Sequence, residues 1–206
     1  MDARARRSRD KLSAAVLELA ERDGIEAVSM VSIAQAAGVN RSTVYEHAAS
    51  PLELLRMVLR DELDAIRDRH LTPGAHPDTR TAVRHTTLDV LRHADAHAAI
   101  YSRALGSAES TALHGMLSAH FRQSVLTLFQ SGAITPPDIP GLDTCFRDVA
   151  AARFVADGTV GAIDAWLATP APRDLAAFAA LYVVLLPTWW PLSATQVLEQ
   201  IAADGQ

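Results

Sequence analysis

The chain has 206 residues but only one cysteine and no long apolar run. Cys145 alone cannot form an internal disulfide, and the first residues lack the apolar core of a secretory signal peptide. The longest apolar run, residues 175–186, has 12 residues, fewer than the ~20 that a helix needs to cross a bilayer. We therefore expect a cytoplasmic protein with no membrane partner.

Known catalytic motifs are also missing. The sequence has no G-x-S-x-G elbow, phosphate-binding glycine loop, H-E-x-x-H pair or dinucleotide fingerprint. Cys145 and His120 could form a nucleophile and base, but Cys145 falls in an apolar periodic stretch and is expected to be a small buried side chain. We expect neither enzymatic activity nor a cofactor.

Histidines recur along one predicted helix. His85, Asp89, His93 and His97 are spaced every four residues, which could align zinc ligands along one face. The apolar residues of this helix take the opposite face, so the histidines are expected on its polar side, and a break near Asp95 displaces His97. We expect no metal site.

The net charge of −5 is unevenly divided. Residues 1–11 hold five basic and two acidic side chains, a net charge of +3, and the rest of the chain carries −8. DNA affinity rests largely on Lys and Arg at phosphates, so the acidic balance argues against broad coating of nucleic acid. The basic arm at residues 1–11 keeps a local phosphate contact open, through Arg4, Arg6 and Arg7.

Apolar residues recur at helical spacing, and alanine, the best helix former, is frequent. The chain is therefore predicted to be all-α. We expect a first helix from about Ser8 to Gly24, followed by helices at 30–37, 41–47, 51–70, 78–94, 96–105, 108–131, 142–169, 172–187 and 193–203. Residues 1–50 are predicted as a DNA-binding domain and residues 51–206 as an effector-binding and dimerisation domain, with 51–71 as the connecting helix.

Residues 29–55 carry the most informative motif. Two short helices separated by a glycine-containing turn form a helix-turn-helix, whose second helix enters the DNA major groove. Gly38 permits the positive φ of the turn. Ile33, Ala34 and Ala37 give the first helix its apolar face, and Val39 and Val44 are expected to anchor the turn and the second helix.

The second helix leaves a polar face for DNA. Arg41 can donate two hydrogen bonds to a guanine, and Ser42 or Thr43 can reach a base edge or a phosphate. Tyr45 and His47 are better placed for phosphates, and Ser29, at the start of the first helix of the motif, is a further predicted DNA contact.

This segment resembles the DNA-binding domain of the tetracycline-repressor (TetR) family of bacterial transcriptional regulators. The matching residues are Ser29, Ile33-Ala34, Ala37-Gly38-Val39, Thr43, Tyr45, His47 and Leu54-Leu55. Ala48 replaces the family's aromatic residue, and Pro51 replaces its phosphate-contacting lysine. We expect the basic arm, or the N–H groups at the start of the fourth helix, to compensate for that lysine.

The resemblance implies a homodimer. A stripe of small residues lets another helix approach closely, and it comprises Gly158, Gly161, Ala162 and Ala165. The next helix is apolar nearly all round, which predicts burial on all sides, and it contributes Leu181 and Leu185. These helices resemble the pair that forms the four-helix dimer interface in the family. They could instead form the core of one chain, but a helix-turn-helix on a two-fold operator needs two copies.

The family also builds a cavity for a small-molecule effector between these parts. The candidates to line it are Tyr101, His114, Leu117, His120, Phe121, Val125, Phe129, Phe146 and Trp166. The resemblance thus implies a repressor that an unknown effector releases from a palindromic operator in double-stranded DNA. The alternatives are a helical ligand-binding or scaffolding protein without DNA activity and, less favoured, an all-α enzyme.

Overall fold

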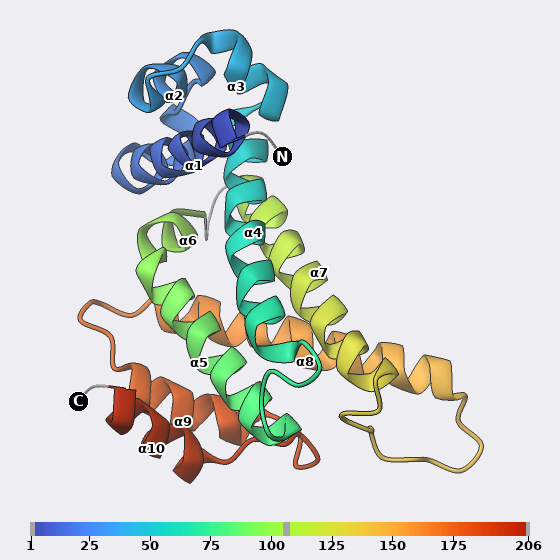
Figure 1. Cartoon of the computed structure of the whole chain (residues 1–206). Coiled ribbons are helices and arrows are strands. Elements are labelled where there is room, and N and C mark those ends of the chain that lie inside the picture. Colours follow the sequence, from blue (N-terminus) through green and yellow to red (C-terminus); the bar gives the residue numbers. More distant parts are fainter. Residues whose placement is uncertain (1–2, 105–107, 205–206) are drawn as a thin grey trace. The chain divides into compact units, whose positions relative to one another are not determined.

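The computed structural model describes residues 3–104 and 108–204, and no strand occurs among them. The elements are helices α1 (Ala3–Asp23), α2 (Met30–Ala37), α3 (Arg41–His47), α4 (Pro51–Leu71), α5 (Thr79–Ala96), α6 (Ala98–Ala104), α7 (Ala108–Gln130), α8 (Thr144–Leu167), α9 (Leu175–Leu185) and α10 (Ala194–Asp204), with a 3-10 turn η1 (Ile25–Ala27) (Figure 1). This confirms the all-α prediction. Among the described helices, none combines the length and apolarity that a membrane span requires.

The first helix begins earlier than predicted. It starts at Ala3, so Ser8 lies inside α1 and the residues of the basic arm form its first turns. Alanine and arginine are strong helix formers, and Arg9 pairs with Asp61 of α4, so the charged segment continues the helix. The helix ends at Asp23, and Gly24 follows with φ of 81°.

The chain divides into two compact units. The first comprises the residues up to Glu62 together with 97–113. Its core draws on every helix of the DNA-binding motif, with side chains that are at most 1% exposed: Leu12, Val16, Ile33, Val44, Leu55 and Leu59. The domain boundary near residue 50 stays a prediction, because this division falls within α4.

The second unit comprises 63–96 and the residues from His114 onward. Asp143 caps α8 by accepting a hydrogen bond from the Phe146 amide, and Asp174 caps α9 through the Ala177 amide. One part of the core joins side chains of α5, α7 and α8 to the segment before α10, and it contains Val83, Val125, Leu128, Ala152, Val155 and Trp190.

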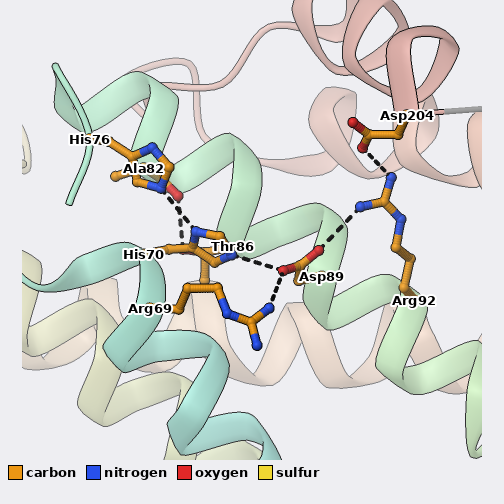
Figure 2. Close-up of polar contacts among 8 residues, drawn as sticks. All are labelled: Arg69, His70, His76, Ala82, Thr86, Asp89, Arg92 and Asp204. Carbon is orange, nitrogen blue, oxygen red and sulfur yellow. Dashed lines mark hydrogen bonds and ion pairs between the residues drawn. The ribbon is translucent and has the colours of Figure 1, made fainter. Parts of the chain in front are cut away.

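A polar network at the end of α4 fastens this helix to α5 (Figure 2). His70 Nε2 lies 2.8 Å from Asp89 Oδ2, so the imidazole donates to the carboxylate. His70 Nδ1 lies 2.9 Å from His76 Nε2. Arg92 bridges Asp89 to Asp204 of α10. Together these contacts hold α4, α5 and α10 at fixed positions within the second unit.

Candidate nucleic-acid interface and ligand cavity

The helix-turn-helix is built by local signals. Ser29 Oγ accepts the Ser32 amide at 3.0 Å, while Ser32 Oγ accepts the Ser29 amide at 3.0 Å. This reciprocal cap starts α2. Gly38 adopts φ 62° and ψ 41°, and its amide donates to the carbonyls that close the helix. Ser29, a predicted DNA contact, therefore has a structural task as well.

Helix α3 presents the predicted polar face. Val44 is fully buried, whereas Arg41, Ser42 and Tyr45 are exposed and Thr43 and His47 are half-buried. Arg41 lies along Tyr45. Its Nη2 donates to the Tyr45 hydroxyl at 3.1 Å, and its guanidinium carbon is 5.3 Å from the ring centroid. The stacked pair offers a planar donor beside an aromatic hydroxyl on the open side of the helix.

Polar side chains take up part of the backbone N–H groups around the start of α4, where a phosphate contact was expected. Glu53 Oε2 accepts the Ala49 amide at 2.7 Å, and Ser50 Oγ accepts the Glu53 amide at 3.2 Å. Ser50 thus caps the Glu53 amide, and Glu53 holds the amide that precedes the cap residue. A carboxylate at this terminus also repels phosphate, which weakens the case for a contact through the N–H groups; that contact stays a prediction.

The basic residues of the arm lie on α1. Arg6 and Arg7 are exposed, and the side chain of Arg4 lies outside the described residues. Arg9 is engaged with Asp61. Arg6 and Arg7 are the exposed members of the three arginines for which a phosphate contact is predicted.

A cavity of about 80 Å³ lies in the second unit, between α4, α5, α7, α8 and α9 and beside Trp190. Three predicted residues line it, namely His120, Phe121 and Val125. The other predicted residues have different surroundings. Tyr101 is buried in the first unit, Leu117 is buried elsewhere on α7, and Trp166 stacks on Phe178 with centroids 4.5 Å apart.

The remaining pocket candidates are also away from this cavity. Phe129 packs against Trp189, His114 lies 3.5 Å from Asp164, and Phe146 is 62% exposed. Sequence reasoning missed other lining residues, among them Arg67, Thr86, Thr87, Thr159, Tyr182 and Trp190. No local pattern marks these, because their approach depends on how five helices pack.

A buried histidine is the main polar group on the cavity wall. His120 is 8% exposed, and its Nδ1 lies 3.1 Å from Asp64 Oδ1. The same carboxylate oxygen accepts Arg67 Nη2 at 2.8 Å. Burial and the nearby Arg67 charge lower the pKa of His120 in spite of Asp64. The imidazole is thus neutral at pH 7, with Nδ1–H donated to Asp64 and Nε2 left as an acceptor.

An apolar surface runs along α8 and α9. Gly158, Gly161 and Ala165 of the predicted stripe are exposed and Ala162 is half-buried. The larger exposed side chains are Phe146, Val149, Phe154, Leu181, Val184 and Leu185. The prediction that α9 is buried on all sides does not hold within one chain, because Val184 is 76% exposed. We call these α8 and α9 residues the apolar face.

Cys145 is exposed in the first turn of α8, not buried as predicted. Its position at a capped helix start, before the buried part of α8 begins, explains the difference. His120, its imagined base, lies in the cavity wall.

The histidine series does not form a row of ligands. His85 stacks on His76 with centroids 4.9 Å apart, and burial with the His76 charge lowers the pKa of His85. Asp89 bonds His70 instead. Helix α5 ends at Ala96, and His97 turns to Glu21 and Glu62 at 3.2 and 2.8 Å.

A capped helix-turn-helix with an exposed polar second helix, carried on an all-α chain, defines a DNA-binding regulator. The comparisons with known proteins agree. Residues 12–58 match the family model described as bacterial regulatory proteins, tetR family. Residues 12–58 are therefore similar to the DNA-binding domain of that family. No curated protein matches it.

Solved structures with the same fold are distant in sequence. The dihydroxyacetone kinase operon activator DhaS has 13% identity and a TM-score of 0.62, over 95% of this chain and 97% of that one. The FadR repressor of Thermus thermophilus in complex with lauroyl-CoA has 19% and 0.58, over 86% and 92%. RolR in complex with resorcinol has 16% and 0.56, over 97% and 95%. At these identities the likeness establishes the fold alone.

Proposed function

We propose that the chain is a homodimeric transcriptional repressor of the bacterial cytoplasm, released from a palindromic operator by a small-molecule effector. The exposed face of α3 carries this proposal. It combines Arg41, Ser42 and Tyr45 on a helix whose opposite side is anchored by the fully buried Val44. Such a helix can enter the major groove without disturbing the core of its unit.

The apolar face supports the dimer. Its small residues allow close helix approach, and its large exposed side chains are of the kind that interfaces cover. Two copies would place two α3 helices on half-sites about one helical turn, or ~10 bp, apart. Dimerisation also doubles a DNA interface that has few basic residues.

The cavity supports effector control. Val155, Thr159 and Tyr182 line the cavity and also a groove of about 390 Å³ beside the apolar face. A ligand that moves these side chains in the cavity therefore also changes the shape of the groove beside the apolar face. Differential binding to two dimer arrangements would then lower operator affinity. The RolR and FadR structures, which hold resorcinol and lauroyl-CoA, give precedents for ligands on this fold.

The test is selection of bound sequences from random duplex DNA with the purified full chain. A symmetric site with half-sites about one turn apart is expected, and binding should weaken steeply with salt. Arg41→Ala should then lower affinity by about 1–3 kcal/mol and relax one base position in each half-site. Arg80→Ala, at an exposed arginine on α5, is the matched control.

The opposite outcomes are equally clear. Recovery of unrelated sequences, or unchanged operator affinity in both Arg41→Ala and Tyr45→Ala, would show that α3 does not read DNA. A chain that binds no duplex at all would leave a helical ligand-binding protein without DNA activity.

A further inference from the structure

The cavity in the second unit has an unusual hydrogen-bonding character. Four of its hydroxyl groups, those of Thr86, Ser124, Thr159 and Tyr182, have already committed their protons to the protein. Thr86 Oγ1 donates to the Ala82 carbonyl at 2.8 Å (Figure 2), and Ser124 Oγ donates to the His120 carbonyl at 3.1 Å. Both oxygens can therefore act towards a ligand only as acceptors.

The same holds at the opposite wall. Thr159 Oγ1 donates to the Val155 carbonyl at 2.6 Å, so the 2.8 Å contact between Thr159 Oγ1 and Tyr182 must be donated by the tyrosine hydroxyl. Burial raises the pKa of Tyr182, so this hydroxyl keeps its proton. The proton points at Thr159, so it is not available for a hydrogen bond to a ligand.

His120 adds the strongest acceptor. Asp64 fixes its tautomer, since an ionised carboxylate held by Arg67 can only accept the Nδ1 proton. Nε2 then carries a lone pair, and His120 as a whole is only 8% exposed. The described residues supply no hydrogen-bond donor to it. A ligand donor that reaches Nε2 would give this acceptor a hydrogen bond within the protein.

The charged groups around the cavity do not favour an anionic ligand. Arg67 is on the wall, but its guanidinium is paired with Asp64 at 2.8 Å and Asp68 at 3.7 Å. A carboxylate ligand would meet Asp64 and the acceptor lone pairs. The indole N–H of Trp190 and the hydroxyl of Thr87 are the other donors on the wall, and a ligand oxygen can accept from them.

Size narrows the ligand further. The cavity measures about 80 Å³, and an engineered protein cavity of ~150 Å³ holds benzene. A single ring is therefore the largest guest that a modest side-chain shift can admit. The remaining lining is apolar, with Val83, Phe121 and Leu128 among its members.

We propose that the effector of this cavity is a small neutral molecule with one apolar ring or a shorter apolar body and a hydroxyl group, whose proton is donated to His120 Nε2. This rests on the proposed function for its regulatory meaning, but not for the binding itself. The hydroxyl oxygen of the ligand can also accept a hydrogen bond from a donor on the cavity wall. An alcohol or phenol can therefore act both as donor and as acceptor in this cavity.

Isothermal titration calorimetry with four matched probes tests the proposal on the full chain. Phenol has the donor, toluene replaces the hydroxyl by methyl, anisole keeps an oxygen acceptor without a donor, and benzoate is an anion. Phenol should bind about tenfold more tightly than toluene or anisole, and benzoate should not bind. Hydrophobicity alone predicts the reverse order for phenol and toluene, so the ranking is diagnostic.

Variants locate the contact. His120→Leu should remove the tenfold preference for phenol while toluene still binds. His114→Leu, on the same helix at an exposed position away from the cavity, should leave the preference unchanged. Anisole or benzoate binding as tightly as phenol, or a preference for phenol that survives His120→Leu, would overturn the proposal.

A measurement of operator release distinguishes the proposed ligand class from the proposed regulatory function. In a gel-shift assay with the selected operator, phenol should release DNA at about tenfold lower concentration than toluene. Failure to bind any operator would refute the proposed function and leave the calorimetric ranking to judge the ligand. Operator binding with equal phenol and toluene affinities would refute the ligand class alone.

Discussion

Replacing Phe154 by glutamate should dissociate the proposed dimer. Phe154 is 68% exposed on α8, so roughly 100–170 Å² of a ring that can bury about 150–250 Å² faces water in the single chain. At ~25 cal/mol per Å², two symmetry-related rings would contribute roughly 5–8 kcal/mol if fully covered. Half of that, to allow for incomplete burial and association costs, corresponds to roughly a hundredfold to a thousandfold in Kd. An unpaired carboxylate in the interface adds to the loss.

Sedimentation velocity over nanomolar to micromolar concentrations measures this change. Val31→Glu is the matched control, because Val31 is 40% exposed on α2, in the other unit. It should sediment as the wild-type dimer, and both variants should keep the wild-type helical circular dichroism. A Phe154→Glu chain that dimerises as tightly as wild type would refute the assignment of the apolar face, as would a wild-type chain that is monomeric throughout.

The other predictions concern the operator contact, a buried hydrogen bond and a titrating histidine. Pro51→Lys should restore one phosphate contact per chain and steepen the dependence of log K on log[salt] by about 0.9 per contact, measured by fluorescence anisotropy. Thr159→Val leaves the buried Tyr182 hydroxyl without its acceptor, so it should cost about 1–3 kcal/mol and lower Tm by roughly 2–10 °C, with part of the loss recovered in the double variant with Tyr182→Phe. Burial lowers the pKa of His97, but hydrogen bonds to Glu62 and Glu21 outweigh it and raise this pKa overall. The resulting stabilisation is complete below about pH 6.5 and is lost as pH rises through the raised value, so urea unfolding should find His97→Asn more destabilising at pH 6 than at pH 9.

The DNA-binding motif was predictable because its signals are local. A serine cap needs only a neighbour three residues on, and Gly38 needs only its own φ. The periodicity of apolar residues likewise predicted the burial of Val44. The start of α1 was missed because a charged arm resembles a solvated tail. Its pairing partner, Asp61, lies far along the chain.

The cavity was predictable only in part. His120, Phe121 and Val125 follow from the periodicity of α7, but Thr86 and Thr159 look like any helical threonine until the opposite helix is known. The role of His120 depends on Asp64 and Arg67 of α4, which no spacing rule connects to residue 120. Tertiary packing, and not local propensity, decides which polar atoms face the cavity.

The small volume of the cavity is compatible with a DNA interface that has few basic residues. A ligand of about seven heavy atoms makes few contacts, so its differential affinity for two dimer arrangements is limited to the ordinary coupling of ~1–3 kcal/mol. Such a ligand can release the protein from its operator only if the affinity for the operator is moderate. Pro51 in place of a lysine, and the Glu53 carboxylate near the same helix start, are expected to keep that affinity modest. Pro51→Lys should therefore tighten operator binding and also raise the phenol concentration needed for release. If the variant bound DNA more tightly but released it at the wild-type phenol concentration, ligand and operator would not be competing through one shared equilibrium.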